Sequence, residues 1–202
     1  MPPVEVIFPI VEGHGEQEAI PVLLRRMAEY CGKFNVTVLP PYRLSKNTII
    51  HRPERFDAVL RLAEGRLRET GSGAGLVICL DSDGDDPVKL RNTIQTRLED
   101  IDNEIKTCPI IPVREYEAWF LAAAAGFREH PRCRADAAYD GDPEAVNGAK
   151  QRFEAVVLRD GEVYSETVDQ AKFTALMNFE LARRCHSFER FMSDMSSWFS
   201  EE

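Results

Sequence analysis

Residues 76–86 read LVICLDSDGDD. The first five are all apolar, as in a strand that is buried on both faces of a parallel sheet. Asp86 and Pro87 then provide an N-cap and a first-turn proline for a helix whose apolar residues recur at helical spacing up to residue 101. A buried strand that leads directly into a helix predicts one unit of an α/β sheet.

The same alternation continues on both sides of this stretch. The predicted strands are Val4–Val11, Asn35–Leu39, Leu76–Leu80 and Cys108–Val113, and the predicted helices begin at Glu16, Pro53, Asp86 and Glu115. Pro9 counts against a central position for the first strand, because proline has no N–H to donate. Short connections between alternating strands and helices predict an α/β fold, with a Rossmann-like, mainly parallel four-stranded sheet and helices on both faces.

The strand pattern stops after the fourth strand–helix unit. Helical periodicity continues, with one helix expected after the pair Asp142 and Pro143 and a last one capped by Ser187. We therefore divide the chain into an α/β domain over residues 1–125 and a helical extension over residues 126–202 that packs on it. The aromatic residues and methionines of the extension recur at helical spacing and are expected to form core rather than a cofactor site.

The composition limits the class of protein. The chain has 202 residues, 44% of them hydrophobic, and a formal net charge of -9. Its longest nearly continuous apolar run, residues 118–127, is about half the length of a membrane span, and its first residues lack the pattern of a signal peptide. Five cysteines without a CxxC pair favour reduced thiols, and we expect a cytoplasmic protein. The negative charge argues against a protein that coats nucleic acid through bulk positive charge.

Acidic residues are concentrated at the predicted strand ends. Residues 81–120 carry 5 basic and 10 acidic side chains. In an open parallel sheet the carboxyl ends of the strands line the ligand crevice, so we expect these carboxylates to meet there. The predicted metal ligands are Glu12, Asp81, Asp83, Asp85, Glu115 and Glu117.

A meeting of carboxylates favours a bound cation. Two carboxylates about 4 Å apart repel each other by roughly 4 kcal/mol at an effective dielectric constant near 20. A divalent metal offsets this repulsion, and an all-oxygen ligand set suits Mg²⁺ or Mn²⁺ better than zinc. A solvated turn that caps the next helix is the alternative for the aspartates, since aspartate favours turns and caps. Glu12 lies at the end of another predicted strand, Val4–Val11, and this additional acid favours the metal site.

Two motifs resemble the Toprim domain, the metal-binding α/β module of topoisomerases, bacterial primases and overcoming-lysogenization-defect nucleases. They are VEGHGE, after the first predicted strand, and LDSDGD, after the third. The resemblance implies that Glu12 is the catalytic glutamate, that Asp81 and Asp83 form the metal-binding Asp-x-Asp pair, and that Glu16 is a second acid. Together with the segments REYEAW and HSFERF, the two motifs extend the resemblance over nearly the whole chain. This combination looks closest to an uncharacterised Toprim-like family of unknown function related to those nucleases.

The resemblance implies a Mg²⁺- or Mn²⁺-dependent, nuclease-like phosphodiester hydrolase or nucleotidyl transferase that acts on nucleic acid, DNA before RNA. Toprim nucleases commonly work beside an ATPase, and because this chain has no P-loop the ATPase would be a separate partner. The basic residue that assists the metal stays open among Arg43, Lys46, Lys89 and Arg114. Two alternatives are a non-catalytic Toprim-like binding subunit of an ATPase-containing complex and a glycosyltransferase, which leaves Glu12 without a role.

Overall fold

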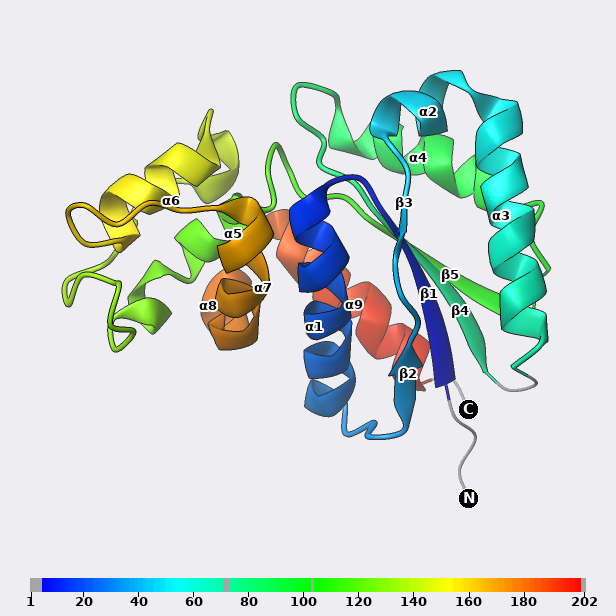
Figure 1. Cartoon of the computed structure of the whole chain (residues 1–202), viewed down its shortest axis with the longest axis horizontal. Helices are drawn as coiled ribbons and strands as arrows, with labels where there is room; N and C mark the ends of the chain where they lie inside the picture. Colours follow the sequence, from blue (N-terminus) through cyan, green and yellow to red (C-terminus); the bar gives the residue numbers. More distant parts are fainter. Residues whose placement is uncertain (1–4, 71–72, 103, 201–202) are drawn as a thin grey trace.

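A parallel sheet forms the centre of the protein (Figure 1). The computed structural model describes residues 5–70, 73–102 and 104–200. The strands are β1 (Glu5–Val11), β2 (Val36–Val38), β3 (Tyr42–Arg43), β4 (Ala74–Cys79) and β5 (Ile105–Ile110). Their order is β2-β1-β4-β5, with β3 also beside β1, and the pairings are parallel. The predicted α/β fold is confirmed; Val4, the predicted first strand residue, lies outside the described residues.

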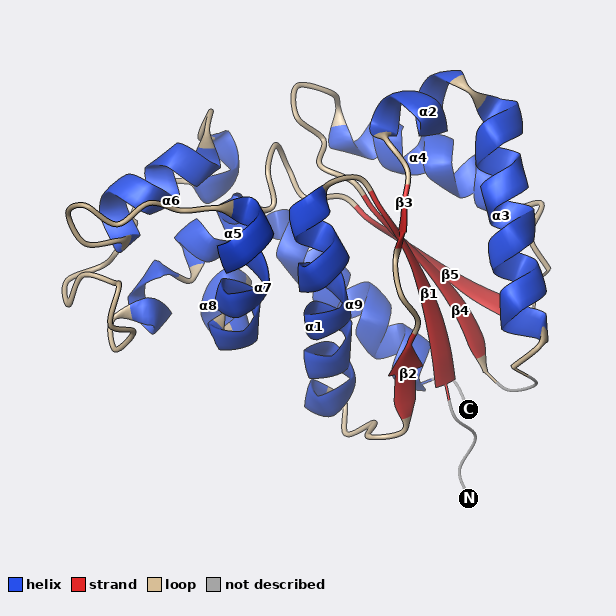
Figure 2. Cartoon of the chain, viewed as in Figure 1, coloured by secondary structure: helices blue, strands red, loops and turns tan. Residues whose placement is uncertain are grey.

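Helices cover both faces of this sheet (Figure 2). They are α1 (His14–Tyr30), α2 (Lys46–His51), α3 (Pro53–Arg68), α4 (Pro87–Leu98), α5 (Glu117–Ala122), α6 (Ala149–Val157), α7 (Glu166–Leu176), α8 (Phe179–Ala182) and α9 (His186–Ser200), with 3-10 turns η1 (Ala124–Phe127) and η2 (Pro143–Ala145). Successive residues of β1 alternate between two cores. Ile7 and Val11 face the core that contains α1 and α9, whereas Phe8 and Ile10 face the core of α3 and α4.

Pro9 lies in a central strand, contrary to the expectation from its missing N–H. β1 pairs with β4 on one side, and on the other side with β2 up to Ile7 and with β3 from Ile10 onward. The Ile7 carbonyl accepts a hydrogen bond from the Leu39 N–H at 2.9 Å. The backbone N–H and C=O groups of the odd-numbered residues of β1 therefore point toward β2 and β3. Pro9 therefore directs its nitrogen to the point where β1 changes partner, which is where a strand tolerates proline.

The last strand lies earlier in the chain than predicted. β5 covers Ile105–Ile110 instead of Cys108–Val113, because its partner β4 ends opposite Ile110. The segments that follow β4 and β5 stay in contact beyond the strands, and the Asp83 N–H donates to the Arg114 carbonyl at 2.9 Å. These bonds hold the acidic loop after β4 against the loop after β5.

Two predicted helix starts in the extension also differ. Asp142 caps only the 3-10 turn η2, because Val146 adopts an extended conformation and ends it. α9 begins at His186, where the Glu144 carboxylate accepts hydrogen bonds from the His186 and Ser187 N–H groups at 3.0 and 2.9 Å. The Ser187 hydroxyl, the predicted cap, instead accepts a hydrogen bond from an indole N–H of α5 at 2.8 Å.

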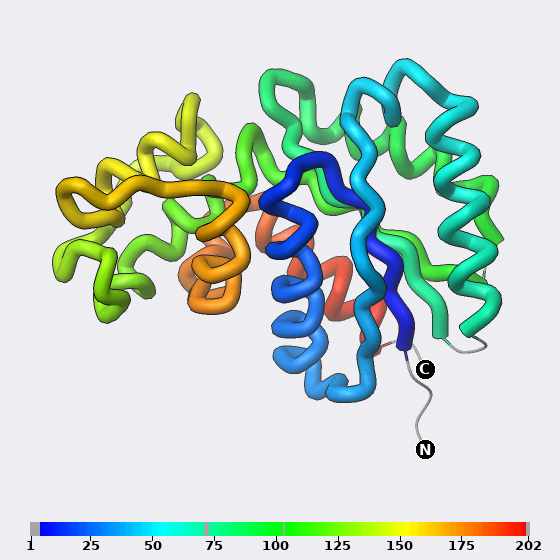
Figure 3. The backbone as a smooth tube through the Cα atoms, viewed as in Figure 1, coloured from blue at the N-terminus to red at the C-terminus, as the bar shows by residue number. Residues whose placement is uncertain are grey.

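The helical extension shares a continuous core with one face of the sheet. Phe120, Phe127, Phe153 and Phe173 lie at its centre, with ring centroids 4.9 to 6.1 Å apart. α1 packs along α7, and α9 returns to the sheet beside β5 (Figure 3). The prediction that the aromatic residues and methionines of the extension form core is confirmed, since Phe188, Phe191, Met192, Met195 and Trp198 are buried. The domain boundary at residue 125 stays a prediction.

Two expectations from the composition can be compared with the structure. All five cysteines are free, as expected for reduced thiols, and four of them are buried. Within the described ranges, none of the helices is long and apolar enough to cross a membrane.

Gly75 in β4 lies directly against the Trp198 ring of α9. A β-carbon at Gly75 would be 1.8 Å from a ring atom. We expect Gly75→Ala to lower the free energy of unfolding by about 1–3 kcal/mol in urea denaturation, because overpacking displaces the ring. Gly65→Ala is the matched control, since no described atom lies within 4 Å of its β-carbon, and it should stabilise α3 by about 0.5–1 kcal/mol. Equal effects of the two changes would contradict this packing.

Asp169 in α7 is 2% exposed and pairs with Arg132. Its carboxylate accepts hydrogen bonds from Arg132 Nη1 at 2.7 Å and from the Ser165 N–H at 3.0 Å. Burial raises the pKa of Asp169, but these bonds outweigh burial and hold the pKa below its usual range. Because the folded pKa is below the unfolded one, this stabilisation is present above about pH 4 and is lost as the pH falls through the folded pKa.

Replacing this carboxylate should therefore matter most at neutral pH. We expect Asp169→Asn to lower the free energy of unfolding by about 2 kcal/mol at pH 7, and to approach wild type in acid, as measured by urea titrations. The control is Asp160→Asn, which breaks an ion pair of a 92% exposed carboxylate and should change stability little. A difference between Asp169→Asn and wild type that widens in acid would contradict the pairing.

Candidate functional site

The loops that follow β1, β4 and β5 leave the sheet at the same end, close to the starts of α1 and α2 (Figure 1). Glu12 follows β1 directly, Asp81 lies two residues beyond β4, and Glu115 lies in the loop between β5 and α5. Parallel strands place their carboxyl ends at one edge of a sheet. We call this the carboxyl edge, and it is the predicted location of the site.

Asp81 is half-buried at the carboxyl edge. Its Oδ1 atom is enclosed and has no hydrogen-bond partner among the described residues. Burial raises the pKa of the Asp81 carboxyl well above its usual range, and the charges of Glu117 and Glu16 raise it further. An enclosed carboxylate oxygen among like charges is unfavourable in the protein alone, and a cation would relieve it.

Glu117, the first residue of α5, is 3% exposed. Its Oε1 atom accepts hydrogen bonds from the Tyr164 hydroxyl at 2.8 Å and from the Gln170 amide at 3.4 Å. Burial raises the pKa of Glu117 to about 7, although the Tyr164 hydrogen bond lowers it. Tyr164 and Gln170 come from the helical extension. They were not predicted, because no motif marks a single tyrosine or glutamine so far along the chain.

Glu16, in the first turn of α1, folds back over Gly13. A β-carbon on Gly13 would lie 2.1 Å from Glu16 Oε2, so the carboxylate fills the space that glycine leaves. Burial raises the pKa of Glu16, and the charges of Glu166 and Glu12 also raise it. Glu166 was not predicted, because an acid in the first turn of a helix is ordinary. These electrostatic interactions define a carboxylate cluster of Glu12, Glu16, Asp81, Glu117 and Glu166.

Lys46, the first residue of α2, binds the loop after β4. Its Nζ atom donates to the backbone oxygens of Asp81 and Ser82 at 3.3 and 3.1 Å, and pairs with the carboxylates of Asp83 and, at 3.2 Å, Asp85. Burial lowers the pKa of Lys46, but the bonds to the two carboxylates outweigh it and raise the pKa. The ammonium group therefore stands where a cation would be for two of the predicted metal ligands.

Glu12 and Glu115 accept hydrogen bonds at the starts of helices. Glu12 Oε1 accepts from the Lys46 N–H, and Glu115 Oε2 accepts from the Lys150 N–H of α6, both at 2.9 Å. Unpaired N–H groups and the helix dipole stabilise a carboxylate at such a position. Lys150 Nζ also pairs with Glu166 at 2.8 Å, which brings a second lysine to the carboxylate cluster.

Arg114, another of the basic residues considered for the site, points away from it. Its Nε atom donates to the Glu144 carbonyl at 3.2 Å, and its Nη1 atom contacts the Asn147 side chain. Its N–H donates to Ser82 Oγ at 2.7 Å. Arg114 therefore ties the loop after β4 to the helical extension.

The carboxylate ligands of the site are of the type that a hard divalent cation prefers. Their side chains are not arranged around a common cation position. Among the residues that the structure describes, no three or more His, Cys, Asp or Glu side chains are grouped so that they could hold a metal ion. Carboxylate oxygens are nevertheless what Mg²⁺ and Mn²⁺ prefer, and the unpaired Asp81 Oδ1 favours a cation. The metal ligands Glu12, Asp81, Asp83, Asp85, Glu115 and Glu117 and the catalytic residues Glu12 and Glu16 stay predictions.

Comparison with known proteins gives a family. A family model described as Domain of unknown function (DUF4276) matches residues 11–196. The chain belongs to this family. The DUF4276 match includes both the carboxyl edge and the helical extension. Among solved structures, the C-terminal region of the Burkholderia pseudomallei OLD protein is similar, with a TM-score of 0.43, 14% sequence identity and 98% of each chain covered. No curated protein matches the chain.

Proposed function

We propose that this DUF4276 protein is a divalent-metal-dependent phosphodiester hydrolase that acts on nucleic acid. The observation that carries the proposal is the enclosed, unpaired Asp81 Oδ1 atom beside Glu16 and Glu117. Carboxylates that repel one another in the protein alone become favourable ligands for Mg²⁺ or Mn²⁺. When bound, such a metal clamps phosphate oxygens and lowers the pKa of an attacking water.

The chain's own residues have distinct roles in this proposal. Asp81 and Glu12 would hold the metal, and Asp83 could serve as a further ligand only without its contact with Lys46. Glu16 is the general base that accepts a proton from the attacking water, because its raised pKa makes it a stronger base than an ordinary glutamate. Nucleotidyl transfer would use the same groups with a hydroxyl in place of water.

Nucleic acid is proposed as the substrate on the resemblance carried by VEGHGE and LDSDGD, with DNA ahead of RNA. A separate ATPase partner belongs to the same proposal. The net charge of -9 is compatible with it, because bound divalent ions would offset part of the acid at the carboxyl edge.

The decisive experiment is a cleavage assay on single- and double-stranded DNA and RNA with Mn²⁺, with Mg²⁺ and with EDTA. We expect metal-dependent cleavage that Asp81→Asn reduces by about a hundredfold to a thousandfold, the scale of losing one group that supports charge stabilisation in the transition state. Asp57→Asn in α3 is the matched control, since it removes a partly exposed aspartate outside the site, and it should cleave like wild type. Cleavage in EDTA, or undiminished cleavage by Asp81→Asn, would contradict the assignment.

A second candidate is a non-catalytic binding subunit. It is favoured by the contacts of Lys46, which already neutralise Asp83 and Asp85 without a metal. This candidate predicts no cleavage of any of the four substrates and no change of melting temperature with Mg²⁺ or Mn²⁺.

A further inference from the structure

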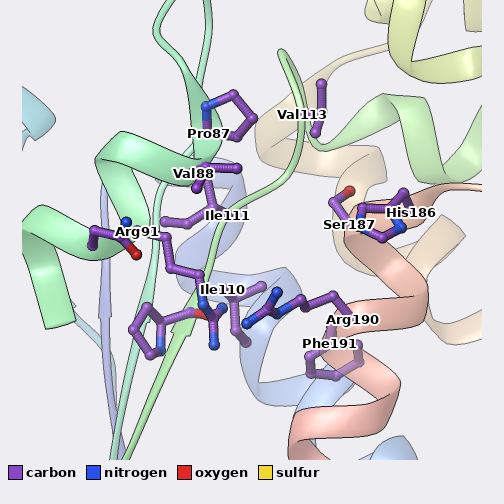
Figure 4. A pocket seen from close by; sticks show the side chains of 12 residues that line it. Pro87, Val88, Arg91, Ile110, Ile111, Val113, His186, Ser187, Arg190 and Phe191 are labelled. Atoms are coloured by element: carbon purple, nitrogen blue, oxygen red, sulfur yellow. The ribbon is translucent and has the colours of Figure 1, made fainter.

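A pocket of about 120 Å³ lies beside the edge strand β5, between the starts of α4 and α9 (Figure 4). Apolar side chains form much of its wall, among them Val88, Ile111, Val113 and Phe191. Arg91 from α4 and Arg190 from α9 point toward each other across it (Figure 4). Val88 is 65% exposed and leaves an apolar surface for a ligand.

The charge of this pocket is opposite to that of the chain. Arg91 Nη2 is held by Asp194 at 2.7 Å, while its Nε atom is buried without a hydrogen-bond partner among the described residues. Arg190 is 54% exposed and lies 3.8 Å from the same aspartate. His186 also lines the pocket, whereas none of its described lining residues is acidic. A guanidinium held by an ion pair, an exposed guanidinium and apolar walls suit a ligand that is planar, apolar on its faces and anionic at one end.

The walls of the pocket are connected to the loops of the carboxyl edge. Pro87, on its wall, follows the Asp83–Asp86 loop, and Val113 immediately precedes Arg114. The wall formed by α9 is connected to the loop after β5 through Glu144. The Glu144 carboxylate caps α9, and the Glu144 backbone carbonyl accepts a hydrogen bond from Arg114 in that loop. We therefore expect a ligand chain bound at the carboxyl edge to reach the pocket across these loops.

We infer that this pocket binds the base of a nucleotide that flanks the cleaved bond, with Arg190 at the phosphate of that nucleotide. The inference rests on the proposed function. A phosphodiester substrate at the carboxyl edge is the reason to assign a nucleotide, rather than an acidic peptide, to this pocket. Bases stack on apolar and guanidinium surfaces with little dependence on sequence. The pocket therefore adds affinity for single-stranded substrate without reading its sequence.

The test measures binding of a fluorescein-labelled oligothymidylate, and of the same strand with abasic sites, by anisotropy in EDTA at low salt. Wild type is expected to bind the strand with bases about tenfold more tightly than the abasic strand. Val88→Asp, at an exposed position, should remove that preference, and Arg190→Glu should weaken binding of both strands about tenfold. Arg25→Glu on α1 reverses the same charge at an exposed position away from the pocket, and should have a smaller effect than Arg190→Glu.

Three outcomes would overturn the inference: no binding by wild type, equal binding of the two strands by wild type, or equal effects of Arg190→Glu and Arg25→Glu. A polyglutamate peptide that loses affinity for Arg190→Glu while the oligothymidylate does not would assign the pocket to an acidic peptide instead. The two proposals can fail separately. If Asp81→Asn abolishes cleavage but the pocket variants bind like wild type, only the pocket assignment fails; if the pocket variants lose binding but no cleavage occurs with any metal, only the catalytic assignment fails.

Discussion

Asp81→Asn is expected to make the metal-free protein more stable and, at the same time, insensitive to divalent metal. The amide keeps the shape of the side chain but removes a half-buried charge that faces Glu16 and Glu117. We expect the free energy of unfolding in EDTA to rise by about 1 kcal/mol, which moves the melting temperature by about 2–4 °C in a protein of this size. In metal the order reverses, because wild type gains about 2.7 kcal/mol when the free metal is at a hundred times its dissociation constant.

The measurement is a pair of thermal melts, in EDTA and in a Mn²⁺ titration, for wild type, Asp81→Asn and the remote Asp57→Asn. The signature is a crossing: Asp81→Asn melts above wild type without metal and below it with metal. Asp57→Asn should follow wild type in both conditions. If Asp81→Asn is less stable than wild type in EDTA, the Asp81 carboxylate has a structural role that the unpaired Oδ1 atom does not indicate.

Lys46→Met is expected to raise the affinity for divalent metal about fivefold. In wild type a metal that uses Asp83 must displace the Lys46 ammonium, so its affinity is reduced by the free energy of that contact. The aspartates are more than half exposed, which limits this free energy to about 1 kcal/mol, a factor of about five in affinity. Without metal, Lys46→Met leaves Asp83 and Asp85 without their cation and should melt below wild type.

Calorimetric titration with Mn²⁺ measures this directly. Lys46→Arg keeps the charge and should bind metal with nearly wild-type affinity. Lys89→Met removes one positive charge from the exposed surface of α4. It measures how much the loss of any nearby positive charge changes the metal affinity. Weaker metal binding by Lys46→Met than by Lys89→Met would contradict competition, and would indicate that Lys46 supports the metal site.

The fold could be predicted because its signals are local. LVICL is apolar enough to be buried on both faces, and Asp86 with Pro87 starts the next helix as expected. Pro9 was misleading because tolerance of a proline depends on the partner strand, and the change from β2 to β3 at that point cannot be read from β1 alone. β5 was misplaced for the same reason, since its end is set by β4.

The site was only partly predictable. Glu12 and Asp81 could be placed at one edge because parallel strands bring their carboxyl ends together. Lys46 was one of several basic candidates, and only its four oxygen contacts distinguish it. Tyr164 and Glu166 reach the cluster through the packing of α7 along α1, a tertiary contact that leaves no periodic or motif signal in the sequence.

The return of α9 to the sheet has a consequence for how the protein is made. Trp198 covers Gly75, and α7 brings Glu166 to Glu16, so β4 and α1 meet partners that are synthesised more than 120 residues later. Ribosomes deliver the chain from its N-terminus, and the sheet alone would expose the apolar face that α9 covers. A nascent chain therefore exposes this face until residues up to Trp198 have emerged, and we expect chaperones to bind it in that interval.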